Sequence, residues 1–182
     1  MLRLRPYKPC DAETIVSWCD NEYTFMNWGG YLFGKYPIKA EDMNSKYLEL
    51  NGDCEEQDNF YPMTLFDEEG IKGHMIMRYI NGDDTILRFG WVILDPASRG
   101  RGYGKEMIRL GLEYAFEILR VRSVTIGVFE NNIPAYHCYL AAGFRKSGLI
   151  EDSYHEIYGE TWKIVELEIS KGEYELKKGL YD

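Results

Sequence analysis

The sequence is poor in the residues that build disulfide frameworks, zinc sites and membrane spans. Its 182 residues include four cysteines, which lie far apart and form no CxxC pair. This spacing argues against a disulfide scaffold or a zinc ribbon and favours reduced thiols in a cytoplasmic protein. No apolar run approaches the roughly 18–20 residues of a membrane span, and residues 1–5 lack the apolar core of a signal peptide. We expect a cytoplasmic protein without a metal or a membrane partner.

Positive charge is also scarce, since 30 acidic residues outnumber 21 lysines and arginines and give a formal net charge of −9. Such a chain is a poor partner for nucleic acid. The acids are concentrated: residues 41–69 hold ten of them and a single base, Lys46, so this segment alone carries −9. A polyanionic cofactor and a cationic substrate would both suit this division of charge. A plain solvated acidic surface is the alternative interpretation.

The sequence does contain a basic, glycine-rich turn, Arg99–Lys105, with the sequence RGRGYGK. It follows an apolar run, residues 89–94, that predicts a buried strand, and it precedes a helical pattern that starts at Glu106. Glycines let backbone N–H groups approach an anion, and the start of a helix favours negative charge. The spacing fits neither the dinucleotide fingerprint nor a P-loop, which needs Ser or Thr after Gly104-Lys105. We expect a phosphorylated cofactor here.

The remaining pattern predicts strand, two helices, three meander strands, helix, strand, helix and two strands. Asp11 is expected to cap the first helix, and the charged tail from Ser170 is expected to be loosely held. A meander followed by a βαβα stretch implies an α/β protein with helices on the faces of a mixed sheet. Strands are predicted at 2–5, 60–66, 72–80, 85–94, 123–129 and 162–169, with extended structure containing a turn at 144 to about 158. Helices are predicted from 11, at 41–50, from 106 and at 132–142, and a polar loop at 51–59.

A second pattern, Asn132-x-x-Ala135-x-x-x-Tyr139-x-x-x-Gly143-Phe144, follows the glycine-rich turn. Together with Arg99-x-x-Gly102-x-Gly104 it resembles the GNAT superfamily, whose members transfer acetyl from acetyl-CoA to an amine. The match covers about residues 85–144. The resemblance implies a mixed, mostly antiparallel twisted sheet of about seven strands flanked by about four helices. It implies one acetyltransferase domain, 1–182, divided into acceptor-side residues 1–84, an acetyl-CoA-binding core 85–144, C-terminal strands 145–169 and a tail 170–182.

The resemblance also assigns the cofactor contacts. The backbone N–H groups of Arg101–Lys105 would bind the pyrophosphate of acetyl-CoA, and the backbone of Val92–Leu94 would pair with pantetheine, as an added strand does. An N–H near Val92 would polarise the thioester carbonyl. Asn132 would touch the pantetheine arm, although it is also a good helix cap. The predicted cofactor-binding residues are Val92, Ile93, Leu94, Arg99, Gly100, Arg101, Gly102, Tyr103, Gly104, Lys105, Asn132 and Ala135.

Tyr139 is the predicted catalytic residue. By resemblance, its hydroxyl protonates the leaving thiolate. Packing alone is the other interpretation of a helical tyrosine, and Tyr136, one turn earlier, is an alternative acid. Cys138 has no partner histidine at a recognisable spacing, so we interpret it as a core residue and expect direct transfer without an acyl-enzyme.

The general base and the acceptor are less well defined. Arg88 stands where some relatives carry a glutamate, which argues against a carboxylate base at that position. The candidate bases are His74, Asp83, Asp84, Glu22, Glu130 and His155. The aromatic segment 20–36 predicts an acceptor pocket, with Glu22 and Trp28 as substrate residues, or a packed aromatic minicore. Trp28-Gly29-Gly30 resembles aminoglycoside 6′-N-acetyltransferases.

These features predict an N-acetyltransferase for a small cationic amine such as a polyamine or an aminoglycoside. Two alternatives stay open: a protein N-terminal acetyltransferase of the ribosomal-protein type, and a non-catalytic CoA-binding module. A homodimer is one option for the assembly.

Overall fold

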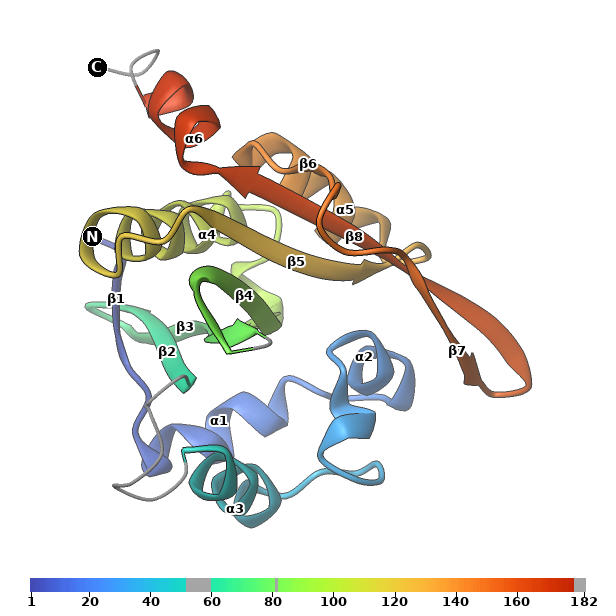
Figure 1. The fold of residues 1–182 in the computed structure, drawn as a ribbon. Helices are drawn as coiled ribbons and strands as arrows, with labels where there is room; N and C mark the ends of the chain where they lie inside the picture. Colours follow the sequence, from blue (N-terminus) through green and yellow to red (C-terminus); the bar gives the residue numbers. More distant parts are fainter. Residues whose placement is uncertain (52–59, 81, 179–182) are drawn as a thin grey trace. The chain divides into compact units, whose positions relative to one another are not determined.

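The computed structural model describes residues 1–51, 60–80 and 82–178, so most of the predicted polar loop 51–59 lies outside the described residues. The chain forms two compact units: unit 1 contains residues 1–78 and 90–107, and unit 2 contains residues 79–89 and 108–182. Strand β4 (Asp83–Leu94) and helix α4 (Tyr103–Glu113) each pass from one unit into the other. Figure 1 shows the elements of both units.

Unit 1 combines antiparallel strands with three helices. Met63 of β2 is opposite Met75 of β3, and Arg3 of β1 is opposite Phe66 of β2. The middle of β3, residues 73–77, is buried without the usual alternation, so this strand is covered on both faces. The elements are β1 (Arg3–Pro6), α1 (Ala12–Ser17), α2 (Glu22–Asn27), α3 (Ala40–Leu50), β2 (Phe60–Asp67) and β3 (Gly70–Ile80).

Unit 2 holds the parallel part of the sheet. The first half of β4 runs parallel to β5, from Ile86 opposite Ser123 to Phe89 opposite Ile126. Strand β8 pairs antiparallel with β5, β6 and β7, and the β7–β8 hairpin extends away from the rest of the unit (Figure 1). The remaining elements are β5 (Ser123–Phe129), α5 (Ile133–Ala142), β6 (Arg145–Lys146), β7 (Ser153–Ile157), β8 (Glu160–Ser170) and α6 (Lys171–Lys178).

The predicted mixed, mostly antiparallel α/β fold is confirmed, with more helices than expected. The described residues contain eight strands and six α-helices. The predicted first helix region is two short helices, because Asn21 starts α2 by accepting a hydrogen bond from the Thr24 N–H at 2.8 Å. Six-residue helices are shorter than the window in which helical periodicity can be recognised.

Asp11 occupies the predicted N-cap position of α1, but its side chain does not cap the helix. A short 3₁₀ turn, Pro9–Asp11, precedes α1, and the Asp11 side chain makes no cap hydrogen bond to it. The buried carboxylate instead accepts two hydrogen bonds from the Arg5 guanidinium, at 2.7 and 2.9 Å, one from the Thr64 hydroxyl at 2.9 Å and one from the Lys8 N–H at 3.0 Å. Arg5 of β1 offers charge-assisted bonds that are stronger than a bond to a helix N–H.

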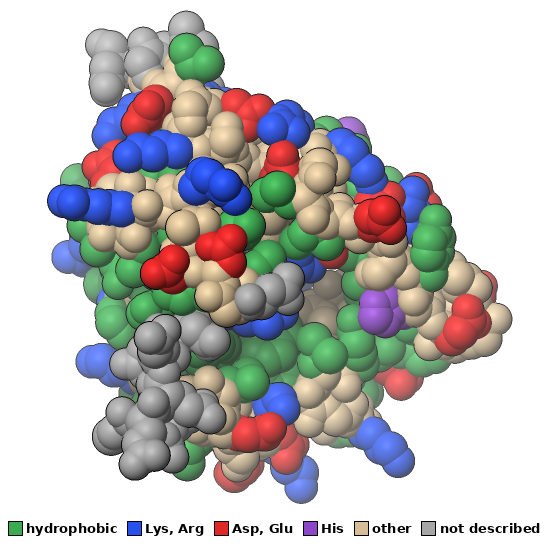
Figure 2. All heavy atoms as spheres, viewed as in Figure 1, with side chains coloured by type: hydrophobic (Ala, Val, Ile, Leu, Met, Phe, Trp, Pro, Cys, Tyr) green, Lys and Arg blue, Asp and Glu red, His purple; other side chains and the backbone are tan. Residues whose placement is uncertain are grey.

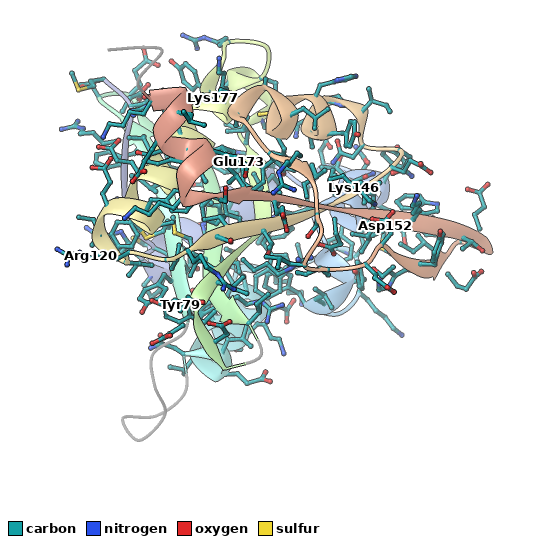
Figure 3. All side chains as sticks on the ribbon, turned by 45° about the horizontal axis from the view of Figure 1, so that its top comes forward. Tyr79, Arg120, Lys146, Asp152, Glu173 and Lys177 are labelled. Atoms are coloured by element: carbon teal, nitrogen blue, oxygen red, sulfur yellow. The ribbon has the colours of Figure 1, made fainter. Side chains whose placement is uncertain are left out.

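The described part of the tail, residues 170–178, is not loosely held, which corrects a second prediction, and residues 179–182 lie outside the described residues. Residues 171–178 form α6, from which Glu173 and Lys177 project (Figure 3). Lys177 donates to the Ala141 carbonyl at 2.7 Å, Glu173 pairs with Arg145, and the Tyr174 ring stacks on Phe116 at 4.8 Å. Acidic and basic side chains are interspersed over this region in Figure 2. The contacts join residues that are 28 to 58 positions apart, so local composition does not reveal them.

Candidate functional site

The glycine-rich turn of unit 1 has an open backbone. After β4, Asp95 accepts hydrogen bonds from the Ala97 N–H at 2.9 Å and the Ser98 hydroxyl at 3.1 Å, and Ser98 is buried. Gly100 and Gly102 then adopt φ values of 72° and 81°, in the left-handed region that favours glycine. No described atom lies within 4 Å of a Cβ built at either position. The turn therefore exposes its backbone where a ligand can approach.

The charge and the peptide geometry of this turn both favour an anion. Arg99, Arg101 and Lys105 are exposed, and the Arg101 guanidinium lies over the Tyr103 ring at 4.9 Å. Helix α4 begins at Tyr103, so its first N–H groups lack helical acceptors. Left-handed glycines that alternate with other residues form concave arrays of N–H groups, which bind phosphate oxygens. These residues fit a pyrophosphate group.

The end of β4 in unit 1 carries the residues predicted to bind pantetheine. The parallel register with β5 ends at Phe89, so Val92, Ile93 and Leu94 lie beyond that ladder. The Ile93 side chain is buried in the core of unit 1. Gly73 was not predicted to matter, yet a Cβ there would lie 2.8 Å from Leu94 Cδ2 and 2.9 Å from Met107 Sδ. Its missing side chain lets β4 and α4 pack against β3.

Trp91 has an unusual backbone conformation for a residue within a strand. Its φ is 45°, a left-handed conformation that costs a bulky residue about 1–3 kcal/mol. The Trp28 indole N–H donates to the Trp91 carbonyl at 2.8 Å, and the Trp91 indole N–H donates to the Gly29 carbonyl at 3.3 Å. Trp28 is buried, as the minicore alternative for the aromatic segment requires, whereas Glu22 is exposed in the first turn of α2.

In unit 2, Tyr139 lies on α5 as the second sequence pattern predicts. Asn132 caps this helix by accepting from the Ala135 N–H at 3.4 Å, and Gly143 ends it with φ 110°. The Tyr139 ring is buried, 6.3 Å from the Phe144 ring, and its hydroxyl has no hydrogen-bond partner among the described residues. Burial raises the pKa of the phenol far above 10. Tyr139 therefore carries its proton at neutral pH.

Arg88 is paired within unit 2. Its guanidinium donates to both carboxylate oxygens of Glu166, at 2.7 and 2.8 Å, and Glu166 is buried. A Cβ on Gly127 would lie 2.6 Å from Arg88 Nη2, so only glycine fits beside the pair. The Glu166 carboxylate on β8 is thus held by Arg88, which makes it a poor candidate for the general base.

His74, one of the candidate bases, is fully buried in unit 1. Its Nε2 lies 2.5 Å from the Tyr47 hydroxyl, and its ring stacks on the Tyr47 ring at 5.6 Å. Burial lowers the pKa of His74 to about 3, with Asp11 opposing the shift. An imidazole with so low a pKa holds a proton weakly. The expected half-buried histidine is therefore a neutral core residue.

The low pKa of His74 predicts a specific loss of stability in acid. The unfolded chain binds a proton near the ordinary pKa of 6.5, whereas the folded chain does so only near 3. The free energy of unfolding should therefore fall, as the pH drops below 6.5, by up to about 1.4 kcal/mol per pH unit more in the wild type than in His74→Gln. Urea unfolding at pH 7, 6 and 5 measures both slopes.

His137→Gln is the control for this prediction, because His137 is exposed on α5. It should retain the wild-type slope. Equal slopes for His74→Gln and the wild type would show that His74 is not buried in its neutral form.

None of the helices in the described residues has the length and apolar character that a membrane span requires. The described part of the chain also contains no group of three or more His, Cys, Asp or Glu side chains arranged to hold a metal ion.

Comparisons with known proteins agree on one family. The model of the family described as "Acetyltransferase (GNAT) domain" matches residues 1–145. The chain is 30% identical over 148 residues to the probable N-acetyltransferase YjcK of Bacillus subtilis, covering 80% of this chain and 81% of that protein. It is 25% identical over 104 residues to the spermine/spermidine N(1)-acetyltransferase of the same organism, covering 54% and 68%. The structure of spermidine N-acetyltransferase from Vibrio cholerae with CoA and spermine superimposes with a TM-score of 0.77 at 21% identity, covering 95% and 97%.

Proposed function

Because the chain belongs to the GNAT family of N-acetyltransferases, we propose that it transfers acetyl from acetyl-CoA to a primary amine of a polyamine such as spermidine or spermine. The cofactor half of the proposal is carried by the open glycine-rich turn, where Gly100 and Gly102 hold left-handed conformations beside two exposed arginines. A turn of this kind binds a pyrophosphate through backbone N–H groups and charge.

The acceptor half rests on charge and on similarity. Helices α1, α2 and α3 carry five acids and a single base, so the unit 1 helices attract a cationic amine. Relatives named for spermidine or spermine are found by both sequence and fold. The acids are Glu13, Glu22, Glu41, Asp42 and Glu49, and the base is Lys46.

Each proposed residue has a separate chemical task. Acetyl-CoA supplies an electrophilic thioester carbon. The Arg99–Lys105 turn holds the pyrophosphate, with Arg99 and Arg101 adding charge. The Val92 N–H donates a hydrogen bond to the thioester oxygen, on which negative charge develops as the C–N bond forms. The Tyr139 phenol would then donate its proton to the sulfur as the C–S bond breaks, and the proton lost from the amine nitrogen would pass through water to restore the phenol.

A panel of amines tests this proposal by release of free thiol from acetyl-CoA. We expect kcat/KM for spermidine and spermine to exceed that for butylamine by at least about 100-fold, because butylamine has the same primary amine and lacks the additional charges. An N-terminal peptide and an aminoglycoside complete the panel. A higher kcat/KM for the peptide or the aminoglycoside than for the polyamines would show that a polyamine is not the preferred acceptor. Binding of CoA without thiol release from any amine would favour the binding module.

A further inference from the structure

Two indole rings fix the peptide that precedes Val92. A peptide unit is planar and trans, so the Trp91 carbonyl and the Val92 N–H lie in one rigid plane and point in opposite directions. Any group that holds the carbonyl oxygen therefore also aims the N–H. The Trp28 indole N–H holds that oxygen at 2.8 Å.

The Trp91 indole makes a second hydrogen bond between the same two segments. Trp91 donates its own N–H to the Gly29 carbonyl at 3.3 Å, so Trp28 and Trp91 each bond the other's segment across 62 to 63 residues. The segment that follows α2, Trp28-Gly29, and the strand β4 are thereby joined by two hydrogen bonds. A Cβ on Gly29 would lie 3.2 Å from the Trp91 ring, and Gly29 has a φ of 83°, so the backbone of this segment fits closely against the indole.

Stacked rings keep the two indoles in place. The Phe33 ring lies 4.3 Å from the Trp91 ring and 5.1 Å from the Trp28 ring, and Tyr47 stacks on Trp91 at 5.7 Å. Trp28 is 5% exposed, so its hydrogen bond is shielded from competing water. This packing holds Trp91 in its left-handed conformation, which it would not adopt by itself.

We propose that Trp28 and Trp91 are positioning residues for acetyl transfer. Trp28 holds the Trp91 carbonyl and so directs the Val92 N–H toward the thioester oxygen. The same hydrogen bond polarises the peptide and strengthens the N–H as a donor. Trp28 directly follows α2, which carries Glu22. The residue that orients the Val92 N–H is therefore adjacent in sequence to one of the acidic acceptor-side helices. The inference rests on the role of Val92 in the proposed function.

Infrared spectroscopy of acetyl-CoA labelled with ¹³C at the carbonyl tests this directly. A hydrogen bond to the thioester oxygen lowers the carbonyl stretching frequency of the bound molecule. We expect a clear lowering in the wild type and loss of most of it in Trp28→Phe, which retains an aromatic ring and loses the N–H donor. The kcat for spermidine should fall about tenfold, less than when an oxyanion donor is removed outright, with the Kd for acetyl-CoA within about twofold.

Trp18→Phe is the matched control, because Trp18 is a buried tryptophan of the same core and none of the described contacts joins its indole to β4. It should keep the wild-type frequency. An unchanged frequency in Trp28→Phe, or an equal change in Trp18→Phe, would overturn the inference. The infrared measurement needs no amine, so failure of the amine panel is a separate result that concerns the acceptor or turnover and not the hydrogen bond to the thioester oxygen.

Discussion

Replacement of Gly102 by glutamate is expected to abolish measurable acetyl-CoA binding while the protein stays folded. Gly102 has a φ of 81° and no described neighbour within 4 Å of a Cβ, so the new side chain would meet open space in the protein. The left-handed conformation costs a non-glycine residue about 1–2 kcal/mol. The carboxylate would occupy the region proposed for the pyrophosphate and repel it.

The size of the effect follows from the bonds that are lost. Hydrogen bonds to a charged group contribute about 1.5–3 kcal/mol each, and the loss of two corresponds to at least about 100-fold in Kd. Titration calorimetry with CoA measures the change. Gly102→Ala separates the two causes, because it adds the strain and a methyl group without the charge, and it should bind CoA more tightly than Gly102→Glu.

Gly159→Glu is a control with closely similar backbone geometry. Gly159 lies between β7 and β8, with a φ of 76° and open space where a Cβ would stand. The substitution therefore adds the same charge and similar strain outside the glycine-rich turn, and CoA affinity should be unchanged. Wild-type affinity in Gly102→Glu would remove the turn from the cofactor site.

The elements that could be predicted are those whose pattern is local. Strand β5 has its predicted bounds, 123–129, because three consecutive β-branched residues, Val124–Ile126, and their flanking signals suffice. The cap at Asn132 and the stop at Gly143 also depend on neighbouring residues alone. The glycine-rich turn was recognisable for the same reason, since its glycines and cations lie within seven residues.

Features that depend on tertiary register could not be predicted. The Arg88–Glu166 pair joins residues 78 positions apart and exists because β5 separates β4 from β8 with Gly127 between them. The full burial of His74 requires both faces of β3 to be covered, which an alternating pattern does not specify. The Trp28–Trp91 bonds likewise need the left-handed backbone at Trp91, which the sequence does not indicate.

The second large effect is expected for Tyr139→Phe, which should lower kcat for the preferred amine by about 100-fold. The substitution removes the proposed proton donor and keeps the ring that packs near Phe144. Because the hydroxyl has no partner among the described residues, the free energy of unfolding should change by less than about 1 kcal/mol. Steady-state kinetics and CoA titration should show a reduced kcat with an unchanged Kd.

Tyr136→Phe on the same helix distinguishes the acid from its alternative, because Tyr136 is one turn earlier and partly buried. It should leave kcat within about twofold of the wild type, and a larger loss than in Tyr139→Phe would transfer the role to Tyr136.

The pH profile gives an independent check. Since burial raises the pKa of Tyr139, the acid stays protonated through pH 10, and kcat should not decline between pH 8 and 10. A decline in that range, absent from Tyr139→Phe, would mean that the phenol ionises normally and is not buried as the structure shows.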